Sequence, residues 1–254
     1  MHRFLLPPEA CRGDRVTLDE ADSHHAARVL RLQTGDAIEG LDGAGARLRC
    51  RLAEVGRRAV SAAVETRGFA PSEPFAVTLA LALLKGRAMD YAIQKATELG
   101  ARVIQPVAAE RCIAHVAPGE AAAKLAGWRA TAIEACKQCG NPWLPEFRAP
   151  VPVAELPRAA GGGALLVASL EPARVRIAEA LVGRATAVTV CLGPEGDFTP
   201  AEYADLRAAG AQPVTLGPHI LRADTAAIAA LALTLDALRT SLNEHPQPPP
   251  TASG

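Results

Sequence analysis

The spacing of apolar and polar residues changes near residue 72. In residues 35–55, "GDAIEGLDGAGARLRCRLAEV", the two kinds alternate on either side of "DGAG", which predicts a β-hairpin. Further strands are expected at 15–19 and 57–66, and a short helix in "DSHHAARVLRL" (22–32), opened by an Asp22 or Ser23 cap. We therefore predict that residues 1–72 form a small β-rich barrel with one helical turn.

Beyond the proline-containing joint "GFAPSEPF" (68–75), apolar runs alternate with segments of helical period. The pattern predicts strands at 75–85, 101–109, 163–170, 186–193 and 212–217, and helices at 89–100, 119–140, 172–183, 199–210 and 225–242. This order indicates an α/β layer fold with a mainly parallel sheet over residues 73–243. The polar, proline-rich end, 244–254, is expected to be a disordered tail.

Composition narrows the class of protein further. The chain has 254 residues, of which 49% are hydrophobic and 21% charged, and its net charge is zero. No run of eighteen apolar residues and no convincing signal peptide is present, so we expect a cytoplasmic protein without a membrane partner. The six cysteines include one CxxC, Cys136 and Cys139, without a second ligand pair, which favours packing at a helix end over a metal or redox site.

The first stretch that could carry chemistry is "CLGPEGDFTP" (191–200). Thr199 followed by a proline and by Glu202 forms a helical capping box and needs no functional explanation. Gly193 and Gly196 lie before the cap, where glycine permits a tight turn or a close ligand. Phosphate-loop and dinucleotide fingerprints are absent, and the two acids of the loop would repel phosphate, so a neutral or cationic ligand is favoured.

The second stretch is "TLGPHILRADTAA" (215–227). Its apolar pair 220–221 could simply be core, and Arg222 could simply form a surface salt bridge. Asp224 or Thr225 is the expected cap of the last helix. In an open α/β sheet, both stretches would lie at carboxyl ends of strands, where ligands bind.

These motifs occur together with "LLKGRAMDYAIQKATELG" and with "HHAARVLRLQTGDAIEGLDGAG" near the N-terminus. In this order they resemble the ribosomal RNA small subunit methyltransferase E family of the SPOUT class, over about residues 2–240. The resemblance implies an S-adenosylmethionine-dependent enzyme that methylates N3 of a uridine in 16S rRNA of the small ribosomal subunit. It also implies a PUA-like barrel at 1–72, a trefoil-knotted SPOUT domain at 73–243 and a homodimer.

The resemblance also implies a set of site residues. The expected cofactor-binding residues are Leu192, Gly193, Glu195, Gly196, Leu216, Gly217, Ile220, Leu221, Arg222 and Thr225. The chain departs from the common family pattern in that Asp197 stands where glycine is frequent, and at Asn141, His219 and Asp224.

Methylation of uridine N3 requires removal of the N3 proton and stabilisation of charge on the ring oxygens. Arg222 suits the second task because its planar guanidinium stays charged. Glu195 could be the base or could order the loop through hydrogen bonds, and we favour ordering. Both residues are expected to be catalytic.

N3 lies on the Watson–Crick edge, so the target uridine must be unpaired, and the RNA needs a platform outside the pocket. The expected RNA-binding residues are His24, His25, Arg28, Arg31, Lys85 and Arg87. At helical spacing, Arg28 and Arg31 would each share a face with His24. A purely structural role of the two histidines is about equally compatible with the sequence.

Three alternatives stay open at this point. A related SPOUT enzyme could act on tRNA or on a ribose 2′-hydroxyl, and a non-catalytic RNA-binding module could keep the fold. A nicotinamide-dependent oxidoreductase would fit the alternation of strands and helices, but its fingerprint is absent.

Overall fold

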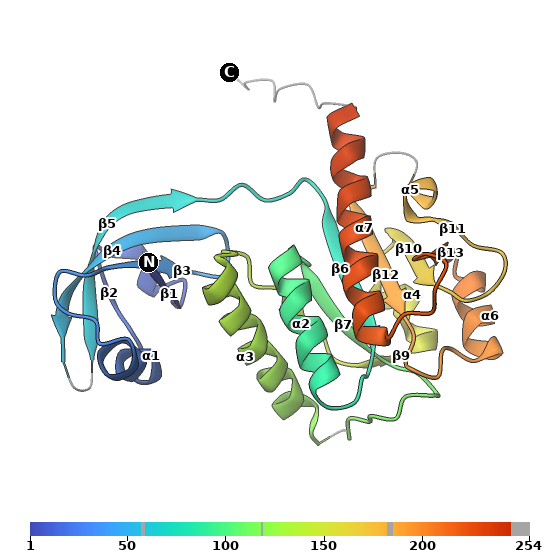
Figure 1. The fold of residues 1–254 in the computed structure, drawn as a ribbon, viewed down its shortest axis with the longest axis horizontal. Coiled ribbons are helices and arrows are strands. Elements are labelled where there is room, and N and C mark those ends of the chain that lie inside the picture. Colours follow the sequence, from blue (N-terminus) through green and yellow to red (C-terminus); the bar gives the residue numbers. More distant parts are fainter. Residues whose placement is uncertain (57–58, 118, 182–184, 245–254) are drawn as a thin grey trace. The chain divides into compact units, whose positions relative to one another are not determined.

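A computed structural model describes residues 1–56, 59–117, 119–181 and 185–244 (Figure 1). The chain divides into two compact units, which are treated separately: Met1–Glu73 with Arg129–Pro145, and Pro74–Trp128 with Glu146 onward. Segment 129–145 thus groups with the first unit, whereas the boundary expected at residue 72 assigned it to the second. The division at 72 stays a prediction, and of the expected tail only residue 244 is described, as the last residue of a helix.

The first unit is built on a five-stranded sheet of order β1-β3-β4-β5-β2, in which the described strands leave β1 and β2 as edges. Its elements are β1 (His2–Leu5), η1 (Ala10–Arg12), β2 (Arg15–Thr17), α1 (Glu20–His24), η2 (His25–Val29), β3 (Ala37–Leu41), β4 (Ala46–Val55) and β5 (Val60–Phe69). The hairpin is confirmed, since β3 and β4 pair antiparallel. Leu48, Cys50 and Leu52 of β4 are buried as the alternation predicts.

The helix after β2 differs from the prediction in its cap and in its form. Asp19, not Asp22 or Ser23, is the cap, and its Oδ1 accepts the Asp22 N–H at 2.7 Å. Ser23 is instead buried, and its hydroxyl donates to the Leu18 carbonyl and accepts the Val60 N–H, both at 3.1 Å. From His25 the helix widens into a π-turn, in which the Leu30 N–H donates to the His25 carbonyl at 2.9 Å.

The last part of α3 (Ala121–Cys139) is bound to the first unit's sheet by two arginines. Arg3 donates to the Gln138 carbonyl at 3.0 Å and Arg47 to the Gly140 carbonyl at 2.6 Å, and both guanidinium groups pair with Glu39. Cations at a helix C-terminus satisfy its free carbonyls and oppose its negative end. This chemistry explains why segment 129–145 groups with the first unit.

The second unit is a sheet of order β11-β13-β10-β12-β6-β7-β8, with β9 also on β7, and every described ladder is parallel. Its elements are β6 (Ala76–Ala82), α2 (Arg87–Leu99), β7 (Val103–Ala108), β8 (Glu146–Phe147), β9 (Val151–Pro152), η3 (Val153–Glu155), α4 (Leu156–Ala159), β10 (Ala164–Ala168), β11 (Val175–Arg176), α5 (Ile177–Ala180), β12 (Ala187–Leu192), α6 (Pro200–Ala208), β13 (Gln212–Thr215) and α7 (Ala223–Glu244). The predicted mainly parallel α/β sheet is therefore confirmed.

Two expected helices of this unit begin elsewhere. Over 172–183, Val175 and Arg176 form strand β11 beside β13, because edge pairing replaces the first helical turn, and helix α5 covers only 177–180. Residues 182 and 183, the end of the expected helix, lie outside the described residues. Helix α7 begins at Ala223, and its first hydrogen bond runs from the Ala226 N–H to the Arg222 carbonyl at 2.7 Å, so neither Asp224 nor Thr225 is the cap.

Helix α7 packs on α2 and on strands β6 and β12, along the side that holds the buried Ala227, Ala230 and Leu231. By length and composition alone it would also qualify as a membrane span, as core helices often do. Strands β13, β10 and β12 are neighbours in the sheet, so their carboxyl ends lie together. The three loops that follow them build the candidate site.

Candidate functional site

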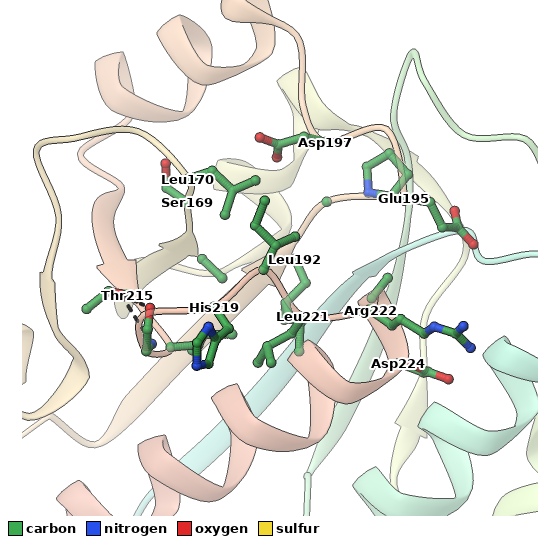
Figure 2. Close-up of a pocket in the computed structure, with 18 of the residues that line it drawn as sticks. Ser169, Leu170, Leu192, Glu195, Asp197, Thr215, His219, Leu221, Arg222 and Asp224 are labelled. Atoms are coloured by element: carbon green, nitrogen blue, oxygen red, sulfur yellow. Dashed lines mark hydrogen bonds between the residues drawn. The ribbon is translucent and has the colours of Figure 1, made fainter.

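A cavity of about 590 Å³ lies at the carboxyl ends of β10, β12 and β13. Figure 2 shows side chains from the three following loops and from the start of α7 around it. Eight predicted cofactor residues line the cavity: Leu192, Gly193, Glu195, Leu216, Gly217, Ile220, Leu221 and Arg222. Gly196 and Thr225 are not among its lining residues.

The loop after β12 is a tight turn followed by a capped helix. The Asp197 N–H donates to the Pro194 carbonyl at 2.9 Å, which closes the turn. The predicted capping box is confirmed, because the Thr199 N–H donates to Glu202 Oε2 at 2.8 Å and the Glu202 N–H donates to Thr199 Oγ1 at 3.3 Å. A Cβ on Gly193 would lie 3.3 Å from the backbone nitrogen of Phe198, so glycine lets the turn fold onto itself.

The segment after β7 braces this loop from outside the cavity. The Glu110 N–H donates to Glu202 Oε1 at 2.8 Å, and the Arg111 guanidinium donates to the Gly196 carbonyl at 3.0 Å. Gly196 also packs closely, since a Cβ there would lie 3.2 Å from Arg111 Cβ. Glycine at 196 thus serves packing of the loop and not the cavity wall.

Glu195 does not provide the hydrogen bonds that we expected to order the loop. Its side chain is exposed and makes no hydrogen bond or ion pair with any residue that the structure describes. Asp197, Glu202 and Arg111 make these bonds instead. A role of Glu195 toward a ligand stays a prediction.

Asp197 has a left-handed backbone, with φ of +59°. Its Oδ1 accepts the Phe198 N–H and the Tyr203 hydroxyl, each at 2.8 Å. Tyr203 is buried and packs edge-on against the Phe198 ring. Burial, opposed by a hydrogen bond with Ser169 and reinforced by the Asp197 carboxylate, raises the pKa of the Tyr203 phenol, so the hydroxyl stays a donor.

The loop after β13 presents Arg222 to the cavity. Gly217 has φ of +135°, and Thr215 Oγ1 lies 3.2 Å from both its N–H and its carbonyl oxygen, which fixes the start of the loop. Ile220 is 80% exposed, which removes the core-packing alternative for this residue. The Arg222 side chain is exposed and has no ion-pair or hydrogen-bond partner in the described part of the chain. A cation beside a helix N-terminus is unfavourable for the helix dipole. Arg222 therefore does not serve the stability of α7.

Sequence reasoning missed the wall formed by the loop after β10. Ser169, Leu170 and Arg174 line the cavity there, and Arg174 donates to the Ser169 carbonyl at 3.1 Å. Asp197, His219 and Asp224 also line it, although none of them is among the expected cofactor-binding residues. The one available signal for the β10 loop was its position after an apolar strand.

The predicted RNA-binding residues are all exposed but fall in two units. His24, His25 and Arg28 lie on α1 and the π-turn, where the regular helical spacing used to place them on one face does not apply. Arg31 lies beyond the helix with φ of +53°, so it does not share a helix face with His24. Lys85 and Arg87 flank Gly86 at the end of β6 in the second unit; the adjacent Leu84 and Ala88 line the cavity.

The arrangement by itself indicates a ligand site of an open α/β sheet. Three loops at carboxyl ends of neighbouring parallel strands enclose an apolar cavity with Arg222, Glu195 and Asp197 on its walls. Models of two families match: an RNA methyltransferase domain over residues 71–235 and an RNA methyltransferase PUA domain over 18–65. The chain is an RNA methyltransferase of this two-part architecture.

Individual proteins that are similar over most of the chain share one name. Ribosomal RNA small subunit methyltransferase E of Synechocystis sp. is 34% identical over 235 residues, which are 91% of this chain and 76% of that protein. The Mycobacterium tuberculosis protein of the same name is 33% identical and covers 86% of this chain and 85% of its own length. The chain therefore belongs to the ribosomal RNA small subunit methyltransferase E family, and the resemblance read from its motifs is confirmed.

Solved structures agree with this assignment. A putative methyltransferase of Legionella pneumophila, in complex with bound S-adenosylmethionine, matches with a TM-score of 0.85 and 30% identity, over 93% of this chain and 98% of that one. Ribosomal RNA small subunit methyltransferase E of Neisseria gonorrhoeae, also bound to S-adenosylmethionine, gives 0.83 and 32%, over 91% and 96%. The predicted fold class is thereby confirmed.

Proposed function

We propose that this chain methylates N3 of a uridine in 16S rRNA with S-adenosylmethionine as methyl donor, in the cytoplasm. The observation that carries the proposal is the cavity, where the exposed Arg222, which has no partner among the described residues, stands with apolar Leu192 and Leu221 between loops at three neighbouring strand ends. Its volume of about 590 Å³ suits a nucleoside-sized cofactor. Family membership and the two solved relatives with bound S-adenosylmethionine support the choice of cofactor.

The cofactor supplies an activated methyl group on a sulfonium. The chain's part is to align N3 with that group and to stabilise the charge that develops as the N3 proton leaves. The Arg222 guanidinium is free to donate to a uracil carbonyl oxygen, since the structure describes no partner for it. The Glu195 carboxylate, exposed at the rim of the cavity, is free to accept the N3 proton.

The RNA must reach the cavity with its target base unstacked. Lys85 and Arg87 are exposed at the carboxyl end of β6, next to two cavity-lining residues, and we assign them to phosphate contacts. His24, His25, Arg28 and Arg31 are exposed on the first unit and offer the second contact surface. A small ribosomal subunit, with a folded RNA surface, suits such a two-part platform.

We also propose a homodimer formed through α7. Thr225, Ala229 and Leu233 follow one another at spacing i, i+4 on a side of α7 that is exposed or half-buried, and Leu233 is 44% exposed. A helix side of small and apolar residues that is partly exposed suits a second copy of the chain. Light scattering should give twice the chain mass for the wild type and the chain mass for Leu233→Lys; a monomeric wild type would refute the dimer.

The central experiment is methylation of small subunits from cells that lack the modification. Labelled S-adenosylmethionine and mass-spectrometric mapping should place the methyl group on uridine N3 of 16S rRNA. Arg222→Ala should lower the rate by at least a hundredfold with a small change in cofactor affinity, because it acts on developing charge. Arg158→Ala, an exposed arginine outside the cavity, is the matched control. A product on ribose or on tRNA would overturn the proposal.

A further inference from the structure

Asp197 is unusual among the cavity residues in its backbone. Residues other than glycine seldom adopt a positive φ, although aspartate tolerates it better than most. Asp197 and Arg31 are the only two described residues other than glycine that do so. A glycine at 197 would adopt this backbone without strain, so the aspartate side chain calls for an explanation of its own.

Among the residues that the structure describes, partners are found for only one of the two Asp197 carboxylate oxygens. Oδ1 accepts both the Phe198 N–H and the Tyr203 hydroxyl at 2.8 Å, whereas Oδ2 has no partner among the residues described. A carboxylate can accept about four hydrogen bonds through its two oxygens. The two bonds to Oδ1 fix the rotamer, so the carboxylate is held in place before a ligand arrives.

The carboxylate lies on the wall of the cavity. Asp197 is half-buried and lines the cavity together with Ser169 and Leu170. In Figure 2 these three residues appear at one side of the cavity, whereas Glu195, Arg222 and Asp224 project at the other side. Arg174 also lines the cavity, but its guanidinium donates to the Ser169 carbonyl at 3.1 Å, so Asp197 is the one carboxylate on this side of the cavity in the described part of the chain.

The side of Asp197 is left for the uncharged nucleoside part. Its donors are the two neighbouring ribose hydroxyls and the adenine amino group, and of these a ribose hydroxyl is the known partner of a carboxylate at a strand end in nucleotide-binding folds. We propose that Asp197 accepts a hydrogen bond from a ribose hydroxyl of S-adenosylmethionine through Oδ2, with Tyr203 as its positioning residue. The inference rests on the proposed function, because it assigns a contact within the same site.

Calorimetry with S-adenosylhomocysteine and its 2′-deoxy and 3′-deoxy analogues tests the contact. A hydrogen bond to a charged acceptor predicts that the wild type loses about ten- to a hundredfold in affinity for one of the two analogues. Asp197→Gly keeps the left-handed backbone without strain and should bind that analogue and the parent ligand within about threefold of each other. Asp197→Asn keeps an acceptor for Phe198 and Tyr203 but loses the charged acceptor, so it should discriminate less than the wild type.

Asp205→Asn on helix α6 is the matched control. Its side chain is exposed and outside the cavity, so the discrimination of the wild type should persist. Equal losses by the Asp197 variants on all three ligands would overturn the inference, as would a loss confined to S-adenosylmethionine, which would indicate a contact with the sulfonium. If the wild type bound neither S-adenosylmethionine nor S-adenosylhomocysteine, the proposed function would fall first, and this inference with it.

Discussion

Glu202 joins two loops with one carboxylate, and its replacement should change stability and cofactor affinity together. Oε2 accepts the Thr199 N–H and Oε1 accepts the Glu110 N–H, each at 2.8 Å. Each bond to a partly solvated carboxylate contributes about 1 kcal/mol. Glu202→Ala should therefore lower the free energy of unfolding by about 2 kcal/mol, which for a chain of this size lowers Tm by about 4–8 °C.

Two further variants distinguish the capping box of Thr199 and Glu202 from the bond between Glu202 and Glu110. Thr199→Ala removes only the bond from the Glu202 N–H and should cost about 1 kcal/mol. Glu202→Gln keeps one carbonyl oxygen, so it should retain one of the two bonds and lose about half as much stability as the alanine variant. Asp205→Ala, on the same helix, controls for removal of a charge from α6.

Differential scanning fluorimetry gives Tm, and calorimetry gives the dissociation constant of S-adenosylmethionine. Glu202→Ala should weaken cofactor binding about tenfold, because Thr199, at the end of the loop that follows β12, loses its link through Glu202 to Glu110. Thr199→Ala should change binding by less than threefold. If both variants weakened binding equally, or if Glu202→Ala left it unchanged, the bracing role of Glu202 would be refuted.

Three more predictions follow from single positions. Gly45→Ala should cost at least about 3 kcal/mol in urea unfolding, because φ is +108° and a Cβ would lie 2.5 Å from the Trp143 ring. Maleimide labelling at pH 8 with peptide mapping should modify Cys139, the exposed cysteine, and leave Cys136 unmodified, since burial, followed by the neighbouring Cys139, raises the Cys136 pKa to about 12. The raised pKa of Tyr203 means that the folded state keeps its proton longer than the unfolded state, so stability should fall as pH rises above about 10, and less so in Tyr203→Phe; an equal fall in both proteins would contradict this assignment.

Local rules allowed much of the fold to be predicted. The alternation around Leu48, Cys50 and Leu52 gave the hairpin, and Thr199 with Glu202 gave the start of α6, because both patterns depend on neighbours a few residues apart. The start of α5 was missed because the pairing of Val175 with Val214 is a contact between distant segments. Propensity alone does not contain that contact.

The candidate site, too, could be predicted where it depends on local motifs and not where it depends on contacts between distant segments. Its two glycine-containing loops were recognisable as motifs, so most of the cofactor residues predicted from them line the cavity. The contacts that position the loops were not recognisable. Arg111 reaches Gly196 across 85 positions and Glu110 reaches Glu202 across 92 positions, and no spacing rule connects residues so far apart.

The π-turn from His25 to Val29 has a further consequence for how this surface can vary. Hydrogen bonds from i+5 to i, in place of i+4, accommodate one residue more per turn than the α-helix does. Removal of one residue from the turn would restore a regular helix without moving its two ends far. The side chains on either side of the turn would keep their directions, because the wide turn already takes up the extra residue. Small length changes at this point would therefore alter the exposed stretch that carries Arg28 while Ser23 and the buried core beneath it stay in place.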